Sequence, residues 1–109
     1  MAIDKVEIID LIGIDNQTGN VILTISDHLD WKDESSHLLL LQDKLNSYLR
    51  FIESGEIYDS YPDAKHRKIV IQIVKKYSLT PRGEEFIRSV KKVIRDAGFD
   101  LISTYLEKQ

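Results

Sequence analysis

The amino-acid sequence predicts an α+β fold, a two-layer sandwich in which two helices cover one face of a four-stranded, mostly antiparallel sheet. Four segments rich in β-branched residues alternate with two segments whose apolar residues recur every three or four positions. The chain has 109 residues, near the commonest size of one domain, so residues 1–109 are expected to form a single domain. Because each helix and sheet buries one face, two layers in the order β-β-α-β-α-β accommodate these elements best.

Residues 6–14 and 20–26 are expected to form an antiparallel hairpin. Both segments are rich in Val and Ile, which favour strands. Between them, Asp15 favours the start of a turn, and Gly19 can adopt positive φ without steric cost.

A first amphipathic helix is expected over residues 36–54, with Asp33 or Ser35 as its N-cap and Gly55 after its end. Gln42, Lys44 and Asn46 lie off its apolar stripe. The stripe consists of Leu38, Leu41, Leu45, Tyr48, Leu49 and Ile52.

A connector over residues 56–66, with a turn at Pro62, is expected to lead into a third strand over 67–77. Thr80 and Pro81 are typical of a helix start, and Gly98 is typical of a helix end. A fourth strand follows over residues 99–106. If the second helix crosses over, the third and fourth strands are parallel, with a right-handed connection.

Two helices can cover only one face of the sheet, so the other face is expected to form an interface. Burying six aliphatic side chains there would stabilise a complex by about 9–18 kcal/mol. Association itself costs about 4–15 kcal/mol, so the balance favours a homodimer or another protein partner. The residues expected on this face are Ile12, Ile22, Thr24, Val70, Gln72, Val74, Ile102 and Leu106, with Ser26 and Thr104 beside them.

The acidic segment before the first helix offers an alternative, a small-ligand or divalent-metal site. Imidazole and carboxylate groups suit Zn²⁺, Mn²⁺ or Fe²⁺ where they converge, although the spacing matches no known motif. The other interpretation is a solvated loop that caps the helix, with Trp31 as a lid on the core. The candidate residues are Asp27, His28, Asp30, Trp31, Asp33, Glu34 and His37.

The composition argues against several other classes of protein. Lys plus Arg is 15 and Asp plus Glu is 18, so the formal charge of −3 makes a nucleic-acid partner an unfavoured alternative, despite the basic residues 65–68. There is no cysteine, no signal-peptide pattern and no long apolar run, which fits a cytoplasmic protein without a membrane partner. No nucleophile or phosphate-loop motif occurs, so no catalytic residue and no cofactor is predicted.

Residues 41–51 read Leu-Gln-Asp-Lys-Leu-Asn-Ser-Tyr-Leu-Arg-Phe and are followed by Gly55 and by Tyr61 with Pro62. This pattern resembles a family of small bacterial proteins of unknown function. The resemblance implies an α+β domain and assigns no activity. Tyr48 is expected to face the core. The ring of Tyr61 is expected to pack on the first helix, with its hydroxyl on a polar partner.

Overall fold

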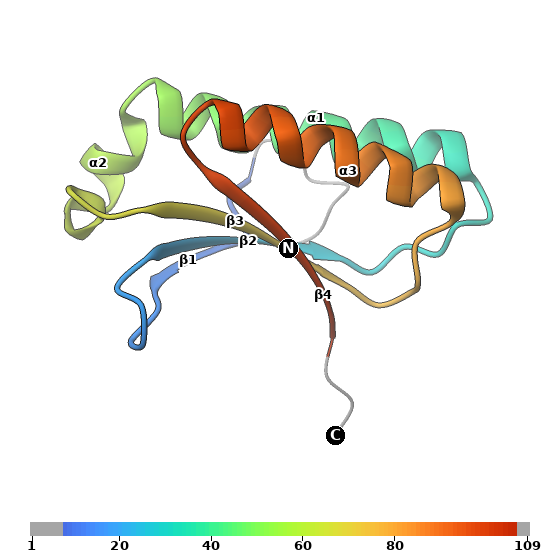
Figure 1. The fold of residues 1–109 in the computed structure, drawn as a ribbon, viewed down its shortest axis with the longest axis horizontal. Helices are drawn as coiled ribbons and strands as arrows, with labels where there is room; N and C mark the ends of the chain where they lie inside the picture. Colours follow the sequence, from blue (N-terminus) through green and yellow to red (C-terminus); the bar gives the residue numbers. More distant parts are fainter. Residues whose placement is uncertain (1–7, 107–109) are drawn as a thin grey trace.

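The computed structural model describes residues 8–106, and within them helices lie on one side of a four-stranded sheet (Figure 1). The α+β class predicted from the sequence is confirmed. Residues 6 and 7 of the expected first strand lie outside the described residues. None of the described helices is long and apolar enough to cross a membrane. The elements are β1 (Leu11–Ile14), β2 (Val21–Asp27), α1 (Glu34–Glu53), α2 (Glu56–Ser60), the 3-10 helix η1 (Pro62–Ala64), β3 (Ile69–Lys75), α3 (Pro81–Asp96) and β4 (Asp100–Tyr105).

The sheet is mixed, so the expectation of a mostly antiparallel sheet is wrong. The strand order is β1-β2-β3-β4. β1 and β2 form the expected antiparallel hairpin, whereas β2–β3 and β3–β4 are parallel. The connection from β2 to β3 contains α1, which returns the chain to the end of the sheet where β2 began. A parallel pair requires such a crossover.

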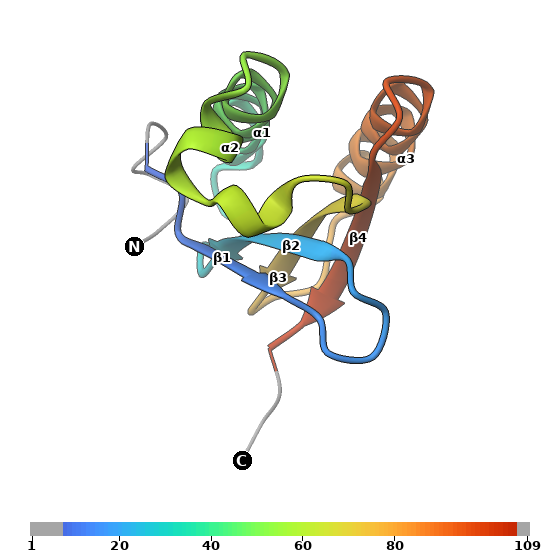
Figure 2. The same ribbon diagram turned by 90° about the vertical axis from the view of Figure 1, so that its left-hand side faces the viewer.

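The topology places the long helices on the same face of the sheet. Parallel crossovers share one handedness, so successive crossovers that step in the same direction put their helices on one side. Here both crossovers step from β2 towards β4. Figure 2 shows α1 and α3 above the sheet and nothing from residues 8–106 packed beneath it.

The segment after α1 contains α2 and η1, which the predicted element order omits. Gly55 has φ 84°, the left-handed conformation expected there, and it separates α1 from α2. Helix α2 has five residues and depends on the complete burial of Ile57 rather than on helix propensity. Pro62 begins η1, and Tyr61 packs against the core. Within residues 8–106 the Tyr61 hydroxyl has no hydrogen-bond partner, contrary to expectation.

A buried ion pair joins α1 to the chain just before β1. The side chains of Lys44 and Asp10 are both fully buried, and Lys44 Nζ lies 2.9 Å from Asp10 Oδ1. Lys44 also donates to the backbone carbonyl of Ile8 at 2.6 Å. Lys44 is buried although it lies off the apolar stripe, because it has acceptors more than thirty residues away in the sequence.

The cluster of Asp10, Lys44 and Tyr48 also holds β1 and β2 together beyond their last paired residues, Leu11 and Thr24. Asp10 Oδ2 accepts a hydrogen bond from the backbone N–H of Ser26 at 3.0 Å. The Tyr48 hydroxyl accepts from the N–H of Asp10 at 2.8 Å and donates to the carbonyl of Thr24 at 2.5 Å. The expected burial of Tyr48 is confirmed, and side chains here replace the next rung of the β1–β2 ladder.

We predict that Lys44→Met lowers the free energy of unfolding by about 3–5 kcal/mol, because it leaves the Asp10 carboxylate buried without its counter-charge. Urea denaturation measures this loss. The exposed neighbour provides the control, Asp43→Asn, which should change stability by less than about 0.5 kcal/mol. The double variant Asp10→Asn/Lys44→Met should recover part of the loss, and a double variant no more stable than Lys44→Met alone would contradict this account.

We also predict that Tyr48 makes the fold sensitive to alkali. Burial of the phenol raises the pKa of Tyr48 above its ordinary value of 10.0. Above that pH the unfolded chain loses the Tyr48 proton and the folded chain keeps it, so stability falls as pH rises, by up to about 1.4 kcal/mol per pH unit. Unfolding measured from about pH 9 to 11 should show a shallower decline in Tyr48→Phe, and parallel declines would contradict the prediction.

Candidate functional site

The loop between β2 and α1 holds a buried His–Asp pair. His37, in the first turns of α1, is 2% exposed, and Asp27, at the end of β2, is 4% exposed. His37 Nε2 lies 2.8 and 2.7 Å from the two carboxylate oxygens of Asp27. His37 Nδ1 lies 3.0 Å from the backbone carbonyl of Asp30. The imidazole therefore ties α1 to both ends of the loop.

These contacts determine how His37 can bind protons. The carbonyl of Asp30 can only accept, so Nδ1 carries a proton and donates it. The Asp27 carboxylate then shares one proton with Nε2, as an ion pair with the imidazolium or as a neutral hydrogen-bonded pair. Both ring nitrogens are engaged within the protein, so His37 has no nitrogen free to contact a substrate or a metal.

Trp31 closes this loop from outside. Its ring stacks on His37, with centroids 3.7 Å apart and planes inclined by 20°. A Cβ at Gly83, in the first turn of α3, would stand only 3.2 Å from the Trp31 ring. Trp31 therefore lies between the N-terminal ends of α1 and α3. It covers the buried His37 rather than the edge of the apolar core expected for a lid, and the close approach of Gly83 to its ring has no signal in the sequence.

The remaining acidic residues of the loop bind neighbouring backbone or side-chain groups. Asp33 caps α1 by accepting from the N–H of Ser36, and Asp30 accepts from the N–H of Lys32. Glu34 faces Arg82 across α1 and α3 at 3.5 Å. His28 is exposed. Within residues 8–106, no three His, Asp or Glu side chains converge to hold a metal ion, so the geometry does not support the metal alternative.

The uncovered side of the sheet, named here the open face, is the second candidate site. Residues paired across a sheet project to the same side, so the register assigns the positions. Most residues expected there are present, but Ile12 pairs with buried Leu23 and points towards the helices. Leu11, which is 61% exposed, takes its place. The open face carries Leu11, Gly13, Ile22, Thr24, Ser26, Val70, Gln72, Val74, Asp100, Ile102 and Thr104.

Leu106 extends the open face beyond the end of β4. With Ser26 and Val74 it lines a small hollow of about 110 Å³, and His28 stands at the rim. The sequence could not have placed Ile12 correctly, because Leu11, Ile12 and Ile14 are all apolar and do not fix which alternate set faces the helices.

The helix side also has an apolar hollow, between α1 and α3. Its volume is about 290 Å³, and its lining includes Leu45, Leu49, Phe86 and Val90. Val93 at its edge is 61% exposed. Nothing in the sequence periodicity indicated that the two amphipathic helices would diverge enough to expose this groove.

The fold and its sites define an α+β domain that engages its buried polar side chains internally and leaves one sheet face open. The chain belongs to DUF6572, a family of unknown function whose family model matches residues 1–107. This confirms the expectation of an uncharacterised family. Searches of curated proteins and of solved structures found no match to the chain.

We predict that His37 quenches the fluorescence of Trp31 through ring contact, because the two rings stack with centroids 3.7 Å apart. His37→Gln should raise the emission of folded protein, and it should lower stability because Asp27 loses its partner. The control is His28→Gln, at an exposed position beside Asp27. Equal emission from the wild type and from folded His37→Gln would show that the stacked pair does not determine the fluorescence.

Proposed function

We propose that this chain is a non-catalytic protein-interaction module that forms a homodimer through its open face. One observation carries the proposal. Among the strand residues that project to this face, only Asp100 is charged, although 30% of the whole sequence is charged. Strands of a sheet that packs on one side alternate apolar side chains towards the core with polar ones towards water, so the water-facing side is usually polar.

The apolar side chains of the open face lie on all four strands, and one pair of them is directly adjacent across two strands. Ile22 pairs with Val70, and Ile102 lies beside Gln72 on the adjacent strand. Ile102 and Leu11 are 42% and 61% exposed. A contiguous patch of this kind supports a binding role more than scattered apolar residues do.

The size of the open face supports a weak, reversible dimer. The four strands lie about 4.8 Å apart and have four to seven residues, which gives a face of roughly 19 by 20 Å. Two such faces in contact would bury on the order of 800 Å². Stable interfaces usually bury more than about 1,000 Å² in total, so this contact is smaller and has the size of a weak, transient interface.

A second copy of the chain suits this face because uncharged, flat surfaces of the same shape can pack about a two-fold axis. The ion pair of Asp100 with Lys68, 2.7 Å long, stands at one corner and need not be desolvated. The hollow beside Leu106 could take one aliphatic side chain of the partner.

We place this module in the cytoplasm of a bacterium. The resemblance of residues 41–51 to small bacterial proteins supports the source, and the absence of cysteine is typical of proteins that need no oxidising compartment. The two alternatives, a ligand site in the loop before α1 and a nucleic-acid accessory role, have less support. His37 is engaged at both nitrogens, and acidic residues outnumber basic ones.

Sedimentation velocity tests the dimer, and we predict that the mass approaches twice 12.6 kDa between about 10 µM and 1 mM. Gln72→Lys/Ile102→Lys should keep the chain monomeric, because each protomer would place two charges against their symmetry mates. The control is Val93→Lys, at an exposed aliphatic position on α3 away from the open face, which should dimerise like the wild type.

Circular dichroism confirms that each variant is folded. A wild-type mass of 12.6 kDa at about 1 mM would overturn the dimer. So would a double variant that dimerises as well as Val93→Lys.

A further inference from the structure

The second feature of the sheet that suggests binding is the outer edge of β4. This strand is last in the order β1-β2-β3-β4, so only its inner edge pairs with another described strand. It runs from Asp100 to Tyr105 with no proline, no glycine and no lysine. Natural edge strands usually carry such residues, because a bare edge pairs with other chains.

The hydrogen-bond pattern identifies which backbone groups are available. The N–H of Leu106 donates to the carbonyl of Lys75 in β3, at 2.8 Å. In a parallel pair, every second residue bonds inward and the others point their N–H and C=O outward. Leu101, Ser103 and Tyr105 therefore present their backbone donors and acceptors at the free edge.

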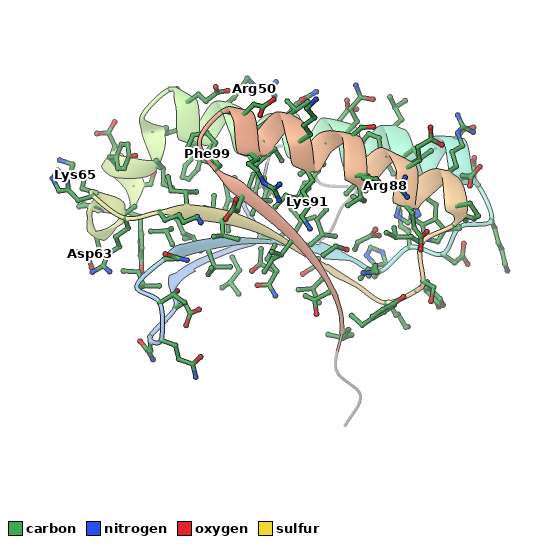
Figure 3. The ribbon with its side chains drawn as sticks, viewed as in Figure 1. Arg50, Asp63, Lys65, Arg88, Lys91 and Phe99 are labelled. Carbon is green, nitrogen blue, oxygen red and sulfur yellow. The ribbon has the colours of Figure 1, made fainter. Side chains whose placement is uncertain are left out.

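A row of basic side chains lies along α3, whose end is close to the start of β4 (Figure 1). Arg88, Lys91 and Arg95 are exposed and follow one another at helical spacing. They occupy the flank of α3 opposite Phe86 and Val93, which face the groove towards α1. Figure 3 shows Arg88 and Lys91 along α3, on the side of the molecule where β4 runs. No ion pair engages these three side chains within residues 8–106.

The electrostatics of Asp100 support this placement. The hydrogen bond from Lys68 holds the pKa of Asp100 below its usual range, and the charges of Arg95 and Lys91 act in the same direction. These two residues of α3 therefore lie close enough to the first residue of β4 for their field to reach it.

We propose that the free edge of β4 binds an extended acidic segment of a partner protein by β-strand addition. The backbone of the segment would pair with Leu101, Ser103 and Tyr105. Side chains at every second position would point to the helix side, beneath α3. From Arg88 to Arg95 the helix rises about 10 Å. This length matches two successive side chains of the bound segment that point to the helix side. Acidic residues at alternate positions meet this row of charges.

Charge and geometry favour this occupant over two others. A second copy pairing through β4 would bring two basic flanks of α3 together, and like charges across an interface are costly. A nucleic acid could use the basic row, but it has no strand of N–H and C=O groups to satisfy the edge. The proposal concerns the edge rather than the open face, so it holds whether or not the chain dimerises.

The test uses a fluorescein-labelled peptide of about eight residues that alternates glutamate with valine. Fluorescence anisotropy should detect binding below about 1 mM that weakens with salt. A peptide with lysine in place of each glutamate should not bind. On the full-length chain, NMR amide exchange should show new protection at Leu101, Ser103 and Tyr105. Ile102 and Thr104 should gain none, because their N–H groups already bond to β3.

Charge-reversal variants test the basic row. Arg88→Glu/Lys91→Glu should lower affinity for the glutamate peptide by about tenfold or more and should bind the lysine peptide instead. The control is Lys65→Glu at the far end of the molecule, as Figure 3 shows, which should leave binding within about twofold.

Three outcomes would overturn the proposal. The first is no binding of the glutamate peptide at about 1 mM. The second is protection that does not alternate along β4 or that falls on the open face. The third is tighter binding of a single-stranded DNA oligonucleotide that depends on Arg88 and Lys91, with no protection of the β4 edge by the peptide.

Discussion

The buried pair of Asp10 and Lys44 is the constraint on which the arrangement of α1 and the hairpin depends. A fully buried ammonium must be matched by acceptors, because an unpaired charge in the interior costs several kcal/mol. Only one placement of α1 brings Lys44 to Asp10 while Tyr48 reaches the carbonyl of Thr24. Hydrophobic contacts tolerate small slides of a helix on a sheet, whereas these directional bonds do not. We infer that the cluster contributes more to the position of α1 than to net stability.

The open face and the free edge of β4 have the same topological origin. Each crossover after the hairpin adds a strand on the same side of the previous one, so helices accumulate on one face. Among residues 8–106, the last strand added, β4, then pairs on one edge alone. A reversal of direction would have covered both faces and created a crevice at the carboxyl ends of the strands. Without that reversal, the surfaces left for recognition are a sheet face and a strand edge.

Local signals in the sequence predicted the local structure well. Asp33 and Thr80 cap α1 and α3, and Gly55 adopts its left-handed conformation, because each depends on residues only a few positions away. Long-range features could not be predicted in this way. The burial of Lys44 could not be predicted, because periodicity contains no information on a partner at Asp10. The parallel pairing of β2 with β3 depends on where α1 returns the chain, which no local pattern specifies.

The loop before α1 shows why residues that cluster in sequence need not form a chemical site. A carboxylate that lies two or three residues before a free backbone N–H is satisfied by that group at little entropic cost. Asp30 and Asp33 both do this, and Asp27 also accepts from the N–H of Leu29 while it holds His37. Convergence on a metal would require these short-range bonds to break. The polar groups of the loop are therefore used to start α1. Within residues 8–106, the backbone groups at the outer edge of β4 have no strand beside them, and the open face carries Asp100 as its one charged strand residue. Another chain can supply contacts at both places.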